Sequence, residues 1–562
     1  MIRLKETKMK CFTLLGFLLL IFSYSSAQVP PATNKADSLN QANQKHFDTL
    51  NNADTLKVVE ILSANRYGYA KKDSLTELLL LVGNVALKQE GTIFYADSAV
   101  YNRKAKIVEA FKNVHINDRD SVHAYSDYLL YHTDTKIAFL KKNVRLTDGK
   151  STLYTEELQY DVNPRVGVYR HGGRVVNGKS VLTSEEGTYY ADLKDIYFKE
   201  DVKLKDPQYF LESDSLLYNT NSEIATFISE TYIEDSAKRT ILTSEGYYDL
   251  KNKNASFGKR PVIHDGPMVI IANQVTTDDY TGLSVLTGNA IFRDTSQGLM
   301  VMGNSIISNR NTGSMLATQK PVMIIVEDKD STFVAADTLY SGRLSELATV
   351  TDSPDSLPGD SAIAVVKDTA KNDSAIRFFR AYHNVKIFSD SLQAVSDSLF
   401  YSDKDSIFRL FTDPVVWSGN SQVTGDTIYM YTKNKKPNEL YVFENGLMVN
   451  KTGEDMYNQI KGNRLFGYFT DGEINNIRAK GNAESIYYAK DQEDKLIGIN
   501  KATSDVIDMR FKNKELNKVV FINTVTGTML PFRQATEEDR HLRSFRWHEN
   551  RRPKSKFELF GN

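Results

Sequence analysis

The sequence predicts an all-β protein built from two-strand units of about 30 residues, and three observations support this. Proline is scarce, at 13 residues, whereas tyrosine and phenylalanine are abundant, at 30 and 28; aromatic residues suit strands, and proline cannot donate to a β-ladder. Two short motifs recur along the chain, half a period apart. Within each motif, apolar residues occupy every second position, which is the periodicity of a strand with one buried face.

The N-terminus predicts an export signal. Four basic residues among the first ten precede an apolar run at 12–22, and small residues at 25–27 follow it. The run is too short to span a membrane as a permanent helix. We therefore expect a signal peptide over 1–27 and a location outside the cytoplasm. The single cysteine, Cys11, would leave with this signal, so no disulfide or thiolate metal site is expected.

The first repeated motif is a small residue followed by Asp, Glu or Asn and then by an apolar or tyrosine position. Most successive copies are 28 to 33 residues apart. A period of this length is typical of repeat architectures. The acidic or amide residues of the motif are Asn65, Asp97, Asp127, Glu156, Glu185, Asp214, Glu245, Asn273, Asn304, Asp337, Asp397, Asp426 and Asn463.

The second motif is Asn or Asp, then Val, any residue and an aliphatic residue. It occurs at 84–87, 113–116, 143–146, 201–204 and 384–387. The apolar side chains of each copy share one parity and the polar ones the other, so one face of each strand is expected to be buried. Turn-type residues separate the motifs.

Shifts in composition divide the chain into six parts. A polar lead-in at 28–55 is expected to be disordered. The β-repeats occupy 56–350, and a flexible acidic insertion at 351–374 replaces one repeat. A second β-repeat region with a C-terminal cap follows at 375–534, and the basic tail at 535–562 is expected to be a solvated face. Contact of this tail with an acidic partner or anionic head groups is the alternative.

The segments 60–67, 83–87, 95–101 and 142–146 are similar to the OstA/LptA family of lipopolysaccharide-transport proteins, also called the organic solvent tolerance family. The resemblance covers 58–343 well and 381–488 less closely. It implies an elongated antiparallel β-jelly-roll, V-shaped in section, that carries lipopolysaccharide through the periplasm, with association with the outer membrane as a further expectation. It also implies that acyl chains bind inside the roll. Exposed edge strands would pair with other transport components or with further copies, head to tail.

Two features depart from the family. The chain has more repeats than the short bridging members, and it lacks room for the outer-membrane barrel of the translocon member. A stack of hairpins with one apolar face would nevertheless provide a trough for lipid, which loses about 0.8 kcal/mol per methylene when it moves into water. The candidate lipid-contacting residues, at the apolar parity, are Val114, Ile116, Leu129, Val144, Leu146, Leu158, Val202, Leu204 and Leu216. Packing of these residues against one another is the alternative interpretation.

Other classes of protein fit less well. An outer-membrane β-barrel or a structural scaffold of the envelope would also use repeated hairpins, and a carbohydrate-active β-helix enzyme would need a paired-carboxylate cleft. The near-neutral charge, 70 basic against 71 acidic residues, argues against a nucleic-acid-binding protein.

The recurring carboxylates could bind calcium, but hydrogen bonding at strand entries is favoured. His115 and His123 could meet across neighbouring strands, but solvent-facing positions are favoured. We expect no enzymatic activity, no catalytic residues, no cofactor and no metal.

Overall fold

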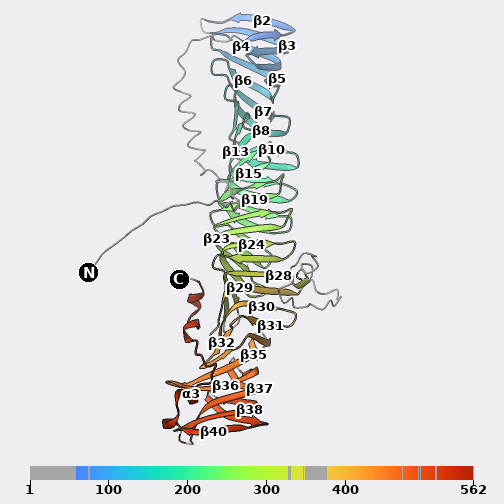
Figure 1. Ribbon diagram of the computed structural model, residues 1–562. Coiled ribbons are helices and arrows are strands. Elements are labelled where there is room, and N and C mark those ends of the chain that lie inside the picture. Colours follow the sequence, from blue (N-terminus) through green and yellow to red (C-terminus); the bar gives the residue numbers. More distant parts are fainter. Residues whose placement is uncertain are drawn as a thin grey trace, which may run out of the picture. The chain divides into compact units, whose positions relative to one another are not determined.

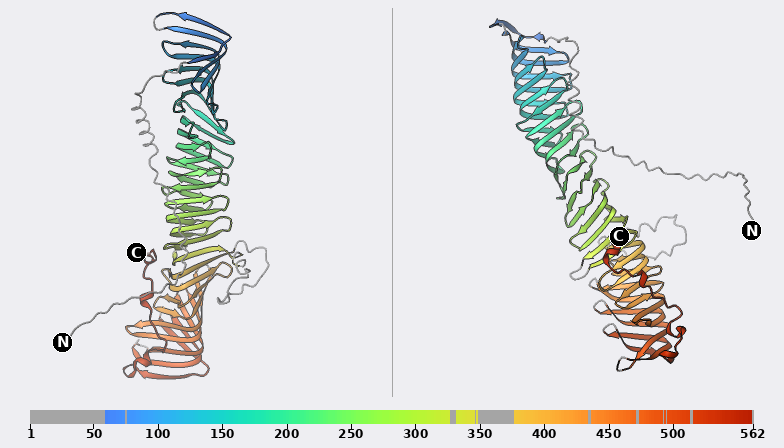
Figure 2. Two further views of the ribbon diagram at one scale, coloured as in Figure 1. Left: turned by 45° about the horizontal axis from the view of Figure 1, so that its top comes forward. Right: turned by 90° about the vertical axis from the view of Figure 1, so that its left-hand side faces the viewer.

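The computed structural model describes residues 59–560, apart from 74–75, 327–330, 346, 348–375, 434–435, 471–472, 492, 494 and 513–514. The signal peptide, the lead-in and the insertion predicted at 1–27, 28–55 and 351–374 lie outside the described residues. The described chain is almost wholly β-strand, and its strands follow one another in sequence order (Figures 1 and 2). The predicted all-β class and the elongated antiparallel β-jelly-roll are confirmed.

The strands fall into three successive groups. The first group is β1 (Glu60–Ser63), β2 (Arg66–Lys71), β3 (Glu77–Gln89), β4 (Thr92–Asn102), β5 (Ile107–Asp118), β6 (Val122–His132), β7 (Ile137–Thr147), β8 (Ser151–Asp161), β9 (Val166–Tyr169), β10 (Gly173–Asn177), β11 (Ser180–Ser184), β12 (Glu186–Tyr190), β13 (Asp195–Lys205) and β14 (Tyr209–Asn219). The second group is β15 (Ile224–Phe227), β16 (Thr231–Asp235), β17 (Thr240–Thr243), β18 (Glu245–Asp249), β19 (Asn254–Gly258), β20 (Val262–Asp265), β21 (Met268–Ile271), β22 (Gln274–Asp278), β23 (Leu283–Asp294), β24 (Leu299–Asn309), β25 (Ser314–Thr318), β26 (Val322–Val326), β27 (Ser331–Ala335) and β28 (Thr338–Arg343). The third group is β29 (Arg377–Phe388), β30 (Gln393–Ser402), β31 (Ile407–Phe411), β32 (Val415–Ser418), β33 (Ser421–Thr424), β34 (Thr427–Lys433), β35 (Lys436–Gly453), β36 (Met456–Thr470), β37 (Glu473–Lys490), β38 (Leu496–Lys512), β39 (Glu515–Ile522) and β40 (Thr526–Pro531). Short helical turns follow as η1 (Phe532–Gln534), α3 (Glu537–Arg540), η2 (Glu549–Arg551) and η3 (Lys556–Phe560).

The strands form two half-sheets that enclose one core. Long strands such as β5 and β13 cross from one half-sheet to the other, whereas shorter strands belong to one of them. Half-sheet 1 contains β9, β12, β15, β18, β19, β22, β25, β28, β31 and β34. Half-sheet 2 contains β10, β11, β16, β17, β20, β21, β26, β27, β32 and β33. We call the line where they meet the crease and the opposite side, where the strands turn, the mouth.

The crease explains both sequence motifs. Alternate long strands shift the register there through two residues with positive φ, as β5 does at Lys112 (φ 60°) and Asn113 (φ 47°). Asn and Asp tolerate this left-handed region better than most residues, which is why they begin the second motif. The first motif lies opposite: Asn113 Nδ2 donates to Asp97 Oδ2 at 3.0 Å, and Asn143 Nδ2 donates to Asp127 Oδ2 at 2.7 Å. The expected hydrogen-bonding role is therefore found, but at mid-strand and not at the strand entry, because the strand bends there.

Most charged side chains of the basic tail face outward, but its apolar residues pack on the sheet, which its charge did not predict. Its chain runs back along the strands of the third group (Figure 1). There, on the outer face of half-sheet 2, two glutamine side chains pair with its backbone. Gln422 donates to the carbonyl of Arg546 at 2.8 Å and accepts from the N–H of His548 at 2.7 Å. Gln459 makes the same pair of bonds with Arg540 and Leu542, at 2.7 and 2.8 Å. The tail covers outward-facing apolar residues that would otherwise meet water, namely Leu447, Val449, Ile486 and Ile499.

Candidate functional site: an apolar cavity in the middle of the roll

One row of side chains decides how the inside of the roll is filled. This row, the mouth row, consists of the inward-facing residues of half-sheet 1 that lie nearest the mouth. In the first part of the chain it alternates tyrosine with smaller residues. In order of strand pairing, the row begins Tyr101, Val108, Tyr131, Ala138, Tyr160, Gly167, Tyr189, Ile196, Tyr218, Ala225, Tyr248 and Ala255.

The tyrosines of the mouth row reach across to half-sheet 2 and hold the mouth shut. Tyr160 donates to Asp118 Oδ2 at 2.7 Å, and the same oxygen accepts from Arg165 Nε at 3.0 Å. Asp118 is fully buried, and Thr92 donates to its other oxygen at 2.9 Å. Buried charge is costly unless it is paired and hydrogen-bonded, as it is here.

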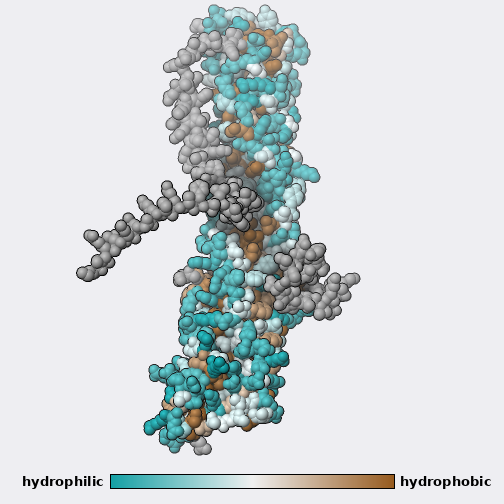
Figure 3. Space-filling view, viewed as in Figure 1, coloured by the Kyte–Doolittle hydropathy of each residue, from teal (hydrophilic) through white to brown (hydrophobic). Residues whose placement is uncertain are grey.

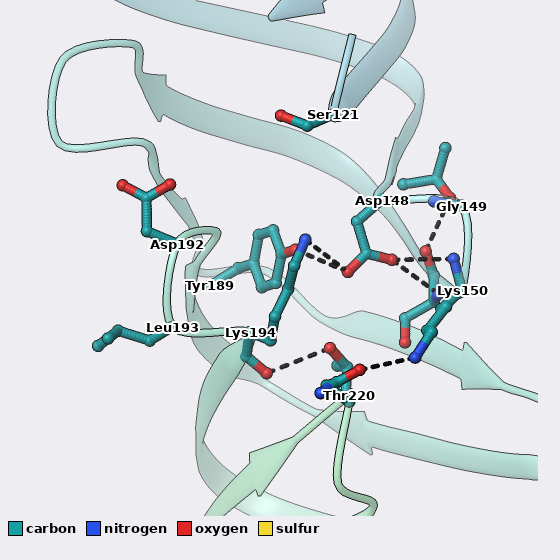
Figure 4. A network of polar contacts seen from close by, with 12 residues as sticks. Ser121, Asp148, Gly149, Lys150, Tyr189, Asp192, Leu193, Lys194 and Thr220 are labelled. Carbon is teal, nitrogen blue, oxygen red and sulfur yellow. Dashed lines mark hydrogen bonds and ion pairs between the residues drawn. The ribbon is translucent and has the colours of Figure 1, made fainter. Parts of the chain in front are cut away.

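The same arrangement of a tyrosine, a carboxylate and a cation recurs one period later in the chain; we call each such cross-contact a rung. Tyr189 donates to Asp148 Oδ2 at 3.1 Å, and Lys194 Nζ lies 3.3 Å from that oxygen (Figure 4). Burial by itself would raise the pKa of Asp148, but the N–H groups of Ser151 and Lys150, with Lys194, outweigh it and hold the pKa below its usual value. Two further rungs join Tyr131 to Gln89 at 2.5 Å and Asn177 to Tyr218 at 2.9 Å. We call this set of contacts the latch, and strands β3–β18 the closed region.

Beyond the latch, the residue types change both in the mouth row and in the row that faces it from half-sheet 2. After Ala255 the mouth row continues Thr277, Ser284, Ser308, Met315 and Ser341, so small side chains stand where tyrosines stood. The facing row of half-sheet 2 keeps the carboxylates Asp265 and Asp294 but gains the apolar residues Met268, Leu299 and Ile325 between and beyond them. Small residues in the mouth row of β22–β28 leave the interior there unfilled. The row becomes bulky again at Phe379, Tyr401 and Phe408, which also line the cavity described next. We call strands β20–β34 the open region.

The open region contains a cavity of about 460 Å³ between the half-sheets. This volume lies within the range of ordinary small-molecule sites. Its walls are mainly aliphatic, aromatic and methionine side chains, which adapt to irregular apolar ligands. The wall residues include Ile263, Met268, Ile270, Phe292, Leu299, Val301, Met323, Ile325, Phe378, Phe379, Leu392 and Met430. Figure 3 shows that polar residues cover most of the outer surface in view and that apolar residues reach it only in patches.

Polar groups gather at the rim of the cavity. Asp279 accepts from Arg239 at 3.2 Å and lies 3.7 Å from Arg310, and all three residues line the cavity. Asp294 accepts from the backbone N–H of Ser296 and so caps a turn at the opposite side of the mouth. The cavity thus combines an apolar interior with a polar rim, an arrangement that suits a ligand with one apolar and one polar part.

The nine residues predicted to contact lipid lie in the packed core of the closed region. Each is at most 2% exposed, and their shared inward direction confirms the alternation read from the sequence. Neighbours of opposite parity, such as Arg145, face outward. Other residues line the cavity, and contact of the nine with lipid stays a prediction.

A third periodic feature of the sequence, a series of tyrosines, marks where the cavity begins, and neither repeated motif includes it. The tyrosines at 131, 160, 189, 218 and 248 recur every 29 or 30 residues, and the series stops at Thr277. Without the pairing between half-sheets, these tyrosines read as ordinary strand residues. Their loss at one position of the repeat is the mark of the open region.

Other candidate chemistry is accounted for by structure. His115 Nε2 and His123 Nδ1 do meet, at 3.1 Å, on the outer face of half-sheet 2, and the His115 ring stacks on Tyr125. Burial, with His123 and Arg145 nearby, lowers the pKa of His115. In the part of the chain that the structure describes, no group of three or more His, Cys, Asp or Glu is placed to hold a metal ion. Among these same residues, no helix has the length and apolarity needed to span a membrane.

Comparisons with known proteins locate the resemblance. Residues 56–214 match the family model described as OstA-like protein. The predicted resemblance to the OstA/LptA family is thereby confirmed for this part of the chain. Among solved structures, the chain is similar to LptH from Pseudomonas aeruginosa, the LptA-homologous periplasmic component of the lipopolysaccharide transport device. That match has 14% identity and a TM-score of 0.18, and covers 19% of this chain and 83% of that one. No curated protein matches the chain.

Proposed function

We propose that this protein, whose residues 56–214 are OstA-like, is a periplasmic lipid carrier of the lipopolysaccharide-transport type that holds acyl chains in the cavity of its open region. The observation that carries the proposal is the cavity of about 460 Å³, with apolar walls and an opening at the mouth. The OstA-like match and the predicted export signal support the location and the class of cargo.

The walls of the cavity favour an apolar guest. Ile270, Phe292 and Leu299 face inward, yet they are only half-buried because the space in front of them is unfilled. An acyl chain in this space would gain about 0.8 kcal/mol for each methylene it removes from water, and it would also cover these side chains. The backbone polar groups of the walls are already paired in the ladders, so the guest meets few unsatisfied donors.

The two ends of the array support a role for edge strands in contacts with partners. In the described chain, β1 and β2 pair only with β3, and β39 and β40 pair only with β38. β1 is exposed along its whole length, and Tyr67 of β2 is 77% exposed. Such edges accept a further strand. We include pairing with other transport components, or with further copies head to tail, in the proposed function.

Photo-crosslinking in intact cells tests the proposal. A crosslinking residue is placed at Ile270 or Phe292, which line the cavity, and at their outward-facing neighbours Val269 and Arg293 as matched controls. We expect lipopolysaccharide adducts at the first pair and none at the second, because alternate residues of a strand face opposite sides.

Two further positions separate the closed region from the open one. Crosslinkers at Leu146 and Leu204 report on the packed core that the sequence singled out. Adducts at these positions alone would move lipid binding out of the cavity and into the closed region. Absence of adducts at all inward positions, in protein recovered from the periplasm, would show that the chain carries no lipopolysaccharide.

A further inference from the structure

A pair of tyrosines separates the cavity from the closed region. The rings of Tyr209 and Tyr248 lie with their centroids 4.3 Å apart. Both hydroxyls donate to Asp279 Oδ2, at 2.6 and 3.0 Å. Asp279 and its partner Arg239 line the cavity, so this group forms the wall at the end of the cavity nearest the N-terminal strands.

The space behind this wall is incompletely filled. A void of about 10 Å³ lies on the side of the closed region, bounded by the two tyrosines themselves. Its other lining residues are apolar: Leu204, Leu211, Ala225, Ile233 and Leu250. A void of this size holds about one water at most. Asp279 and Arg239 face the cavity and the two rings face this void, so the ion pair and the rings together form the barrier between the two spaces.

We infer that Tyr209 and Tyr248 are specificity-determining residues that set the length of acyl chain the cavity accepts, by acting as its end wall. This inference rests on the proposed function. An engineered cavity of roughly 150 Å³ holds one six-carbon ring, so a cavity of about 460 Å³ corresponds to about eighteen carbons. A longer chain would have to displace the rings to go further.

The hydrogen bonds of the two tyrosines make the wall resistant to displacement. Rotation of either ring would leave a hydroxyl, and one acceptor site of Asp279, without a partner in a poorly solvated place. Arg239 is 8% exposed and lies 3.1 Å from Asp235 as well as 3.2 Å from Asp279. Burial by itself would raise the pKa of Asp279, but Tyr209, Arg239 and Tyr248 outweigh it and hold the pKa below its usual value, so the carboxylate stays ionised near neutral pH.

Binding of saturated fatty acids of graded chain length to the purified full chain tests the inference. For the natural protein we expect the affinity to rise about fourfold per added methylene, up to about eighteen carbons, and then to level off. Tyr248→Ala removes one ring of the wall and opens the void behind it. We expect this variant to shift the longest favoured chain by about six carbons, the size of the ring that is removed.

Two variants serve as controls, and a third replaces Tyr248→Ala if that variant does not fold. Tyr189→Ala removes an equivalent tyrosine of the latch that is remote from the cavity lining, and should leave the chain-length preference unchanged. Tyr248→Phe keeps the ring and loses the hydroxyl, and should shift the preference far less than Tyr248→Ala. If Tyr248→Ala does not fold, Tyr209→Leu tests the same wall.

The outcomes separate this inference from the proposed function. If the natural protein binds no fatty acid of any length, the proposed function fails. If it binds them but Tyr248→Ala and Tyr209→Leu keep the natural length preference, the end wall is assigned wrongly. An equal shift in Tyr189→Ala would likewise overturn the assignment, because it would show general loosening of the roll.

Discussion

The closed and open regions are built to the same repeat and yet have opposite interiors. In the closed region, tyrosines of the mouth row reach carboxylates and amides of half-sheet 2, and the core is filled. In the open region, Thr277, Ser308 and Ser341 occupy the same row, and a cavity replaces the packed core. The backbone ladder and the crease continue through both. The choice between a packed core and a binding site therefore depends on few side chains in one row, and not on the fold.

The largest expected effect comes from breaking the latch at its most buried carboxylate. Asp118→Ala leaves Tyr160 and Arg165 without their shared acceptor. Removal of one partner of a buried ion pair costs about 3 to 5 kcal/mol. Asp294→Ala, at the mouth of the open region, removes only a turn cap and should cost about 1 kcal/mol. Urea unfolding followed by region-resolved hydrogen exchange compares them, and equal losses would contradict the latch.

Truncation of leucine in each region sharpens the comparison. Leu158 is fully buried in the closed region, so Leu158→Ala leaves a new void and should cost about 3 kcal/mol of unfolding free energy. Leu299 already borders the cavity, and Leu299→Ala should cost about 1 kcal/mol, since it removes fewer contacts. Both values follow from the same denaturation curves. A larger cost at Leu299 would mean that the cavity is closed in solution.

One substitution should convert the open region toward the closed form. Ser308→Tyr restores a tyrosine to the mouth row in front of the cavity. Its ring should occupy the cavity and weaken binding of a fatty acid by about tenfold, equivalent to about 1.4 kcal/mol. Isothermal titration calorimetry measures the change. Ser305→Tyr, on the same strand but outside the cavity lining, provides the control and should bind as the natural protein does.

The smallest expected effect is on acid sensitivity. The pKa of Asp148 is lowered in the folded protein, so the folded state binds fewer protons than the unfolded one below about pH 4. The stability contributed by this rung is therefore complete above about pH 4 and is lost as the pH falls through the folded pKa. Asp148→Asn should flatten this dependence in urea unfolding between about pH 5 and about pH 2. An unchanged dependence in Asp148→Asn would show that this rung does not contribute to it.

The repeat and the direction of its side chains could be predicted from the sequence because they are local. Val114 and Ile116 face the core as their alternation predicts, and Asn113 adopts the left-handed conformation that its residue type favours. The cavity could not be predicted, because it depends on which residues face each other across the mouth. Tyr160 and Asp118 are 42 residues apart and lie in different half-sheets. The pattern of either strand alone contains no information about that contact.

The packing of the tail against the sheet could not be predicted for a related reason. Its charge predicts a solvated face, and most of its charged side chains do point outward. What holds it are Gln422 and Gln459, whose amides replace a strand partner for its backbone. Glutamine in a strand gives no sign of such a partner until the two segments are seen together.

The return of the tail along half-sheet 2 also has a consequence for how the protein matures. The tail follows in the chain every strand that it covers, from β26 and β27 to β38. During synthesis, the outer face formed by Leu447, Val449 and Ile486 therefore stays uncovered until the tail has been made. A chain without the docked tail would expose an apolar sheet surface that promotes aggregation with other chains. Docking of the tail thus completes the cover over this face of the sheet.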